Sequence, residues 1–253
     1  MGPAHHAYRD IFESPIFRNF DLRPDERDLL QSLSLVARHY ASGTEITREG
    51  DRVDRTFILD SGWACLYKVL PDGERQIIDF PLAGDVVGLH GSTGSSQRSF
   101  MSITDIVVYE VGATALISAI ARSERLAQFF MAEESRHKGI LVEHLTNLGR
   151  RSALSRTAHL LLELGARLEQ VGNAAGAGYK CPLTQYDLAD ALGLTAIHVN
   201  RMLRELRQSD LLSFQRGYVE FLDIERLKYL SGFEETYISQ TVPGRTNRNV
   251  KKN

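Results

Sequence analysis

Residues 192–201 read LGLTAIHVNR, and their polar and apolar side chains recur with helical spacing. A helix that starts after the Gly-Leu-Thr turn buries Val199 and turns Ile197, Asn200 and Arg201 outward. Arginine donates two hydrogen bonds to guanine, asparagine pairs with adenine or a phosphate, and an apolar side chain lies on a thymine methyl group. This outward face therefore predicts base readout in the major groove of DNA.

The surrounding sequence has the parts of a helix-turn-helix. Thr184 and Asp187 have the spacing of a capping box. Ala189 is a small residue where the two helices would cross, and Gly193 permits the turn between them. The second helix, residues 196–208, would enter the groove with its amino-terminal end toward the bases. SFQRG and YVEFL follow, with a bend at Arg216-Gly217, and predict a short hairpin that forms a wing.

These elements give a predicted set of DNA contacts. Some members read bases, as above, and others lie where they would hold phosphates and fix the register. The full set is Thr184, Gln185, Thr195, Ile197, His198, Asn200, Arg201, Arg204 and Arg216.

Composition and charge narrow the class of protein. The chain has 253 residues, is 43% hydrophobic and 25% charged and carries a net charge of −2, which is typical of a globular protein and argues against coating nucleic acid by global charge. The longest uncharged apolar run, residues 111–121, is too short to cross a bilayer, and no hydrophobic signal region opens the chain, so we expect a cytoplasmic protein that does not contact membranes.

Cys65 and Cys181 are too few for a disulfide framework or an iron–sulfur site, and we expect buried reduced thiols.

The elements that must position the DNA-reading helix follow from the rest of the chain. A short helix after Pro24 leads into residues 40–111, where strand and turn signals alternate as in a small antiparallel barrel. A long helix and a second helix at 152–171 come next, and a glycine-rich stretch at 172–180 is predicted as a loop. The fold class is α+β, with an amino-terminal domain at 1–122, a long helix at 123–151, a winged helix-turn-helix at 152–235 and a disordered polar tail at 236–253.

The long helix would outrun any small domain that it could lie against. We therefore predict that its apolar seam packs on a second copy of the chain and makes a homodimer. Glu133, His137 and His144 fall near this seam, where we expect partly solvated positions, and a role of the histidines as pH or metal sensors stays open. The seam consists of Leu126, Phe129, Phe130, Ile140, Leu141, Leu145 and Leu148.

Four motifs resemble the Crp/Fnr family of bacterial transcription factors, the superfamily of the cyclic-AMP receptor protein and the fumarate-nitrate regulator. They are PDGERQIIDF, LAGDVVG, NLGRRSA and HVNR, and the resemblance covers nearly the whole chain. It implies a jelly-roll barrel of the cyclic-nucleotide-binding type, a homodimer and a two-fold DNA site. RNA polymerase is a candidate further partner.

The chain departs from this resemblance where family members hold a cyclic nucleotide. Gly88 is followed by Leu89 in place of the ribose-holding carboxylate, and Arg98-Ser99 is followed by Phe100 in place of a small residue. We therefore expect no cyclic AMP, and Gly88, Leu89, Arg98 and Ser99 become candidate residues for another small anionic effector.

Two further departures limit what can be transferred. Leu141 and Val142 stand where the cyclic-AMP receptor offers hydroxyls to adenine. The cysteine cluster of the iron–sulfur members is missing. Haem held by a histidine stays open as a cofactor. Ile197 replaces a common glutamate of the recognition helix, so the family's operator is not carried over.

Two functions of other classes remain as alternatives. The first is a small-molecule-binding module whose helix-turn-helix docks a protein. The second is an enzyme, which we do not expect because the polar barrel residues have neither a nucleophile elbow nor metal-ligand spacing. Those residues are Asp60, Asp79, Asp85, His90 and Ser99. Activation or repression, the operator, the target genes and the effector are not predicted.

Overall fold

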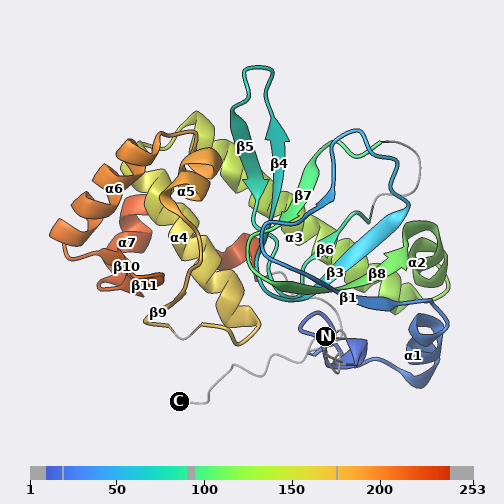
Figure 1. Cartoon of the computed structure of the whole chain (residues 1–253). Helices are drawn as coiled ribbons and strands as arrows, with labels where there is room; N and C mark the ends of the chain where they lie inside the picture. The colour runs from blue at the N-terminus through green and yellow to red at the C-terminus, as the bar shows by residue number, and fades with distance from the viewer. Residues whose placement is uncertain (1–9, 19, 90–94, 175, 240–253) are drawn as a thin grey trace, which may run out of the picture.

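The computed structural model describes residues 10–18, 20–89, 95–174 and 176–239. His90 and the predicted polar tail beyond residue 239 lie outside these ranges. Figure 1 shows a β-rich half and a helical half, with one long helix running behind both. The α+β class and the order of barrel, long helix and winged helix-turn-helix are as predicted.

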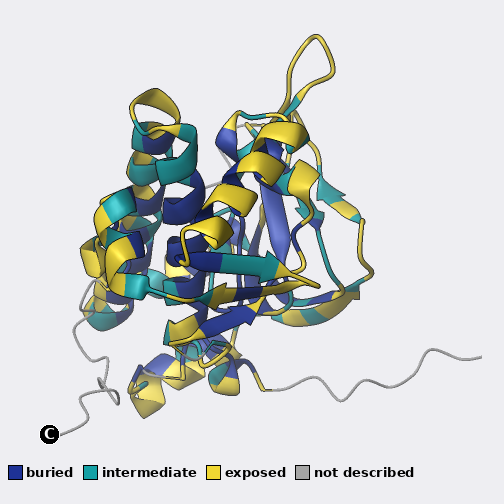
Figure 2. Ribbon diagram, turned by 90° about the vertical axis from the view of Figure 1, so that its left-hand side faces the viewer, coloured by how far each residue is buried: buried dark blue, intermediate teal, exposed yellow. Residues whose placement is uncertain are grey.

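Two four-stranded antiparallel sheets face each other in a jelly-roll-like sandwich. One sheet has the order β1-β8-β3-β6 and the other β2-β7-β4-β5. The strands are β1 Val36–Tyr40, β2 Glu45–Thr47, β3 Arg55–Ser61, β4 Ala64–Val69, β5 Arg75–Asp79, β6 Val86–Val87, β7 Ser99–Ser102 and β8 Ile106–Gly112. The β4–β5 hairpin, which turns through PDG, stands out from the body in Figures 1 and 2 and is exposed at its tip.

Alternation of side chains along the strands produces the hydrophobic cores. Phe57 and Leu59 point between the sheets, where they meet Phe100, whereas Ile58 points outward to a cluster with the first helices. On the second sheet Cys65 faces the helical half instead. Both faces of the sandwich are thus covered, and both cysteines are buried free thiols as predicted.

Three helices flank the first sheet. They are α1 Pro24–Gln31, α2 Ala113–Ile120 and α3 Glu124–Gly149, and a 3-10 turn, η1 Ile11–Glu13, precedes them. Helix α2 was not predicted, because the apolar run at 111–121 was interpreted only as too short for a membrane span. None of the described helices is both long enough and apolar enough to cross a membrane.

The predicted seam of α3 is wrong in four of its seven members. Leu126, Phe129, Phe130 and Ile140 are buried within their own chain, because the amino-terminal part of α3 covers the first sheet. Two predicted members, Leu145 and Leu148, are exposed by 72% and 38%, and Met131 and Val142, which are exposed by 72% and 60%, join them in an apolar stripe. Helical periodicity showed that α3 has apolar faces, but could not assign each face to its partner.

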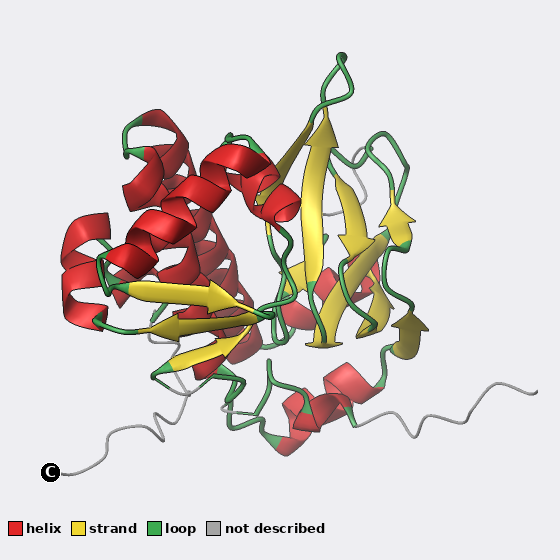
Figure 3. Cartoon of the chain, turned by 60° about the vertical axis from the view of Figure 1, so that its left-hand side comes forward, coloured by secondary structure: helices red, strands yellow, loops and turns green. Residues whose placement is uncertain are grey.

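The carboxyl-terminal half consists of four α-helices, a short sheet and a last 3-10 turn. They are α4 Ala153–Gln170, β9 Gly178–Lys180, α5 Gln185–Leu192, α6 Ala196–Gln208, β10 Leu212–Gln215, β11 Tyr218–Phe221, α7 Ile224–Ser231 and η2 Glu235–Tyr237. The prediction of a loop through residue 180 is wrong at its end, because β9 pairs with β11 and adds a third strand to the wing, as Figure 3 shows.

Candidate DNA-binding surface

Local hydrogen bonds define the two helices of the helix-turn-helix. Thr184 Oγ1 accepts from the Asp187 backbone N–H at 3.2 Å, and Asp187 Oδ2 accepts from the Thr184 backbone N–H at 2.9 Å, which completes the capping box. Gly193 ends α5 with a φ of 58°, in the left-handed region that favours glycine. Thr195 caps α6 by accepting from the His198 backbone N–H at 3.2 Å.

The recognition helix α6 separates its buried and exposed faces as predicted. Val199, Met202, Leu203 and Leu206 are buried. Ile197 is 81% exposed and is therefore available to a ligand surface. The other predicted contacts on this helix, His198, Asn200, Arg201 and Arg204, are also exposed.

Two of the predicted contacts touch each other. The Asn200 amide donates a hydrogen bond of 2.5 Å to Gln185 Oε1, so the outward faces of α5 and α6 meet at this pair. The hydroxyls of Thr184 and Thr195 already accept helix-cap bonds. The Thr184 hydroxyl also donates to Asp187 Oδ2 at 2.7 Å, whereas the Thr195 hydroxyl, which accepts the cap bond, can still donate its proton to a phosphate.

The wing turns as the sequence predicts. Arg216 and Gly217 both have positive φ values, 51° and 72°, as in the tight turns that match the twist of a hairpin. Arg216 is exposed at the tip. In β9, a Cβ atom on Gly178 would lie 2.2 Å from the Val219 carbonyl oxygen, so glycine permits the close approach of β9 to β11.

The β4–β5 hairpin contacts the helix-turn-helix directly. Arg75 Nε lies 2.7 Å from Asp190 Oδ2, and Arg75 Nη2 lies 3.0 Å from Asp187 Oδ1. The Gln76 amide donates to the Ala191 carbonyl oxygen at 3.3 Å. Sequence analysis did not foresee this contact between β5 and α5, because more than 100 positions separate Arg75 from its partners.

A buried ionic network holds α4 against the sandwich and against α3. Arg167 on α4 lies 2.9 Å from Asp79 and 2.8 Å from Asp85, and Arg136 on α3 lies 2.5 Å from Asp85. Burial raises the pKa of Asp79, but the surrounding positive charges, with Arg167 the strongest, together outweigh it and hold that pKa below its usual range. Asp79 and Asp85 are thus structural ion-pair partners. Glu133 is buried, and its Oε2 lies 2.9 Å from Arg136 Nε, so the prediction that Glu133 is partly solvated is wrong.

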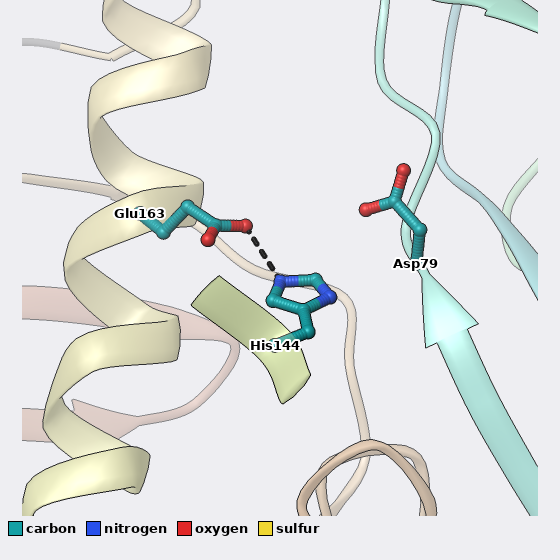
Figure 4. Close-up of side chains that lie close together, drawn as sticks. All are labelled: Asp79, His144 and Glu163. Carbon is teal, nitrogen blue, oxygen red and sulfur yellow. Dashed lines mark hydrogen bonds and ion pairs between the residues drawn. The ribbon is translucent and has the colours of Figure 1, made fainter. Parts of the chain in front are cut away.

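His144 joins three elements in the same network, as Figure 4 shows. Its Nδ1 lies 2.9 Å from the Ile78 carbonyl oxygen and its Nε2 lies 2.9 Å from Glu163 Oε1. Burial lowers the pKa of His144, but Glu163, Asp79 and the Ile78 carbonyl oxygen together more than offset this and raise it to about 9. Both ring nitrogens can therefore donate at neutral pH. The His144 side chain is 16% exposed, in agreement with the predicted partly solvated position.

Asp79, His144 and Glu163 each offer one atom within 4.8 Å of the others, a grouping that could hold a metal ion. Arg167 already brings positive charge to this point, since its Nη1 lies 2.9 Å from Asp79 and 3.4 Å from Glu163. His137 lies nearby, with Nδ1 3.5 Å from Asp79 Oδ2. Sequence analysis missed the group because its members come from three elements far apart in the chain.

The predicted effector residues do not share one environment. Gly88 accepts a hydrogen bond from the Thr56 hydroxyl at 3.0 Å, while Leu89 packs against the outward cluster of the first sheet. Ser99 Oγ accepts from the Glu49 backbone N–H at 3.1 Å, and Arg98 is partly buried. Phe100 packs on Phe57 with ring centroids 5.4 Å apart and fills space between the sheets.

Comparisons with known proteins agree with this architecture. Residues 155–230 match the Crp-like helix-turn-helix domain, and residues 37–123 match the cyclic nucleotide-binding domain. The chain is 30% identical over 193 residues to the nitrogen fixation regulation protein FixK of Bradyrhizobium diazoefficiens, covering 76% of this chain and 81% of that protein. It is 28% identical to the fumarate and nitrate reduction regulatory protein of Vibrio cholerae, covering 91% and 92% of the two chains.

The solved structures show the same relationship. The structure of FixK2 from Bradyrhizobium japonicum superposes with a TM-score of 0.72 at 30% identity and covers 80% of this chain and 100% of that one. The sandwich, the long helix and the winged helix-turn-helix are therefore shared along most of both chains. With this identity and coverage, the chain belongs to the Crp/Fnr family of transcription regulators.

Proposed function

We propose that the protein works as a homodimer that reads a two-fold DNA site through α6. The observation that carries this proposal is the outward face of α6, where an exposed Ile197 stands beside Asn200 and Arg201 on a helix fixed by its own cap. Each copy would place residues 196–208 in one of two major grooves, about 34 Å apart. A cytoplasmic location, a regulatory rather than catalytic role and a contact with RNA polymerase belong to the same proposal.

Within this surface we assign two kinds of contact. Ile197, Asn200 and Arg201 read base edges, with Arg201 donating to guanine O6 and N7. The remaining residues hold the phosphate backbone and fix the register of the helix. They are Thr184, Gln185, Thr195, His198, Arg204 and Arg216.

Replacing Arg201 by alanine tests the assignment. The operator is first recovered by selection from a pool of random-sequence duplexes, and binding is then measured at fixed salt on that operator and on random DNA. We expect operator affinity to fall about 10- to 100-fold, because a bidentate pair discriminates by roughly 1–3 kcal/mol, with the loss of preference confined to one base pair per half-site. Arg226→Ala is a matched control, since Arg226 is an exposed arginine on α7 that pairs with Asp223.

Two results would contradict the proposal. An equal loss on random DNA would make Arg201 a phosphate contact. A folded dimer that shifts no duplex at low salt would favour the second class of function, in which the helix-turn-helix docks a protein.

For the sandwich we propose a sensing role, with a small anionic effector other than cyclic AMP near Gly88, Leu89, Arg98 and Ser99. A thermal-shift panel of nucleotides and metabolites tests it, because a ligand of the folded state raises the melting temperature. Arg98→Ala should abolish the shift given by the true effector. A shift by cyclic AMP that survives in this variant would contradict the proposal.

A further inference from the structure

The sandwich has a hollow on β1 and β3, lined by none of the predicted effector residues. Its volume is about 320 Å³, and it is lined by Ala37, Arg38, His39, Tyr40 and Arg55. Small-molecule sites in proteins commonly measure roughly 300–1,000 Å³, so the hollow can accept a small ligand. Its lining is polar and contains two arginines.

A buried carboxylate holds both arginines in place. Glu110 Oε2 lies 3.2 Å from Arg38 Nε and 3.2 Å from Arg55 Nη1, and Glu110 Oε1 accepts from the Tyr40 hydroxyl. The Glu110 side chain is only 6% exposed, while those of Arg38 and Arg55 are 53% and 60% exposed. The carboxylate thus lies beneath two guanidinium groups that remain open to solvent.

Charge and hydrogen-bond capacity indicate what would fill the hollow. Each guanidinium carries five N–H donors, and within the described part of the chain the hydrogen bonds found for Arg38 and Arg55 run to Glu110. One arginine would suffice to neutralise Glu110, so the second leaves an excess positive charge. Guanidinium forks match the oxygens of phosphate and carboxylate groups, and side chains already held in place lose less entropy on binding.

We propose that this hollow is a binding site for a small molecule that bears phosphoryl or carboxylate oxygens. Arg38 and Arg55 donate to these oxygens from two sides, and Glu110 positions both arginines from below. The site is separate from the space between the sheets that Phe57 and Phe100 fill. It is also distinct from the proposed DNA surface, so the binding measurement needs no DNA.

Calorimetric titration of the full chain with inorganic pyrophosphate and with citrate, at constant ionic strength and without DNA, tests the site. We expect one saturable event per chain with at least one of the two probes. Arg38→Ala and Arg55→Ala should each weaken it about tenfold or more, as expected for loss of a charged hydrogen bond. Each single variant leaves Glu110 paired with the other arginine. If Arg55→Ala does not fold, Arg55→Lys keeps the charge without the planar fork and should also weaken binding.

Two controls separate this site from its competitors. Arg48→Ala removes an exposed arginine that pairs with Glu45 and does not line the hollow, and it should leave binding unchanged. Arg98→Ala should also leave binding unchanged. Absence of saturable binding by both probes, an equal loss in Arg48→Ala, or a loss in Arg98→Ala but not in Arg38→Ala would overturn the proposal.

Discussion

Asn200 is held in position before any DNA arrives. Its amide donates one hydrogen bond to Gln185, and a second N–H and the carbonyl oxygen remain to address a base. Ordering a polar side chain at an interface costs about 0.5–1.5 kcal/mol, and the contact with Gln185 reduces this cost. If Asn200 reads a base as proposed, its readiness to do so depends on Gln185, which belongs to the other helix of the motif.

This dependence predicts coupling between the two residues. We expect Asn200→Ala to lower operator affinity about 10- to 100-fold, Gln185→Ala to lower it by less, and the double variant to lose less than the product of the two. Fluorescence anisotropy on the selected operator measures all four proteins. Strictly multiplicative losses would show that Gln185 acts on phosphates independently of Asn200.

His144 makes stability depend on pH. Its pKa is raised from 6.5 to about 9 in the folded chain, so its contribution is fully present below about pH 6.5 and is lost as the pH rises through 9. Urea unfolding at pH 6, 7.5 and 9.5 should show a loss on the order of a few kcal/mol across this window. His144→Gln removes the titrating group and should flatten this part of the profile. An identical pH profile in both proteins would exclude His144 as the cause.

Among the elements, α3 has two apolar faces with different partners. One face covers the first sheet, and the other presents the stripe of Met131, Val142, Leu145 and Leu148 to solvent. Positions 131, 138, 142 and 145 follow one another at intervals of seven, four and three residues, which are compatible with the seam of a two-helix coil, and Leu148 lies beside this seam. Lys138 lies among them and would place a charge near the axis, so we expect a dimer of moderate strength.

Leu145→Glu should weaken that dimer. It places a carboxylate on an exposed side chain at the stripe and opposite its own copy, so we expect the dissociation constant to rise at least tenfold. Sedimentation velocity over a range of concentrations measures this. Tyr229→Glu is the control, because Tyr229 is 92% exposed on α7 and lies off the stripe. If both variants dimerise as the unchanged protein does, the interface lies elsewhere.

Elements with local signals were predictable, and those with distant partners were not. The capping box, Gly193 and the Arg216-Gly217 bend act within a few residues, so spacing alone located α5, α6 and the wing. In contrast, β9 exists because it pairs with β11, about 40 positions away. The ionic partners of Arg167 and the occupied face of α3 likewise depend on tertiary packing, which periodicity does not specify.

Over the whole molecule, the sandwich and the helix-turn-helix are joined by charged contacts as well as by a hydrophobic core. A partly buried set of contacts runs from Arg75 to α5, and a fully buried set runs from Asp79 and Asp85 to α4 through Arg167. Buried charges are costly unless paired, and removing one partner costs about 3–5 kcal/mol. The buried contacts therefore favour one arrangement of the two halves.

Arg75→Ala should loosen this arrangement without unfolding either half. We expect faster amide hydrogen exchange in α5 and in the β4–β5 hairpin, with the sandwich core unchanged, because Arg75 bridges only these two elements. Asp190→Asn should give a weaker effect of the same kind. Unchanged exchange in α5 would show that the bridge contributes nothing in solution.

The Asp187 carboxylate takes part both in the capping box of α5 and in the contact with the β4–β5 hairpin. Asp187 closes the amino-terminal turn of α5 through one oxygen and receives Arg75 through the other. A genetic screen for lost repression or activation would thus return substitutions at position 187 although the side chain never needs to approach a nucleotide. Footprints of such mutants would retain the sequence preference of the parent protein and lose only occupancy, and that signature tells a scaffold defect from a reading defect.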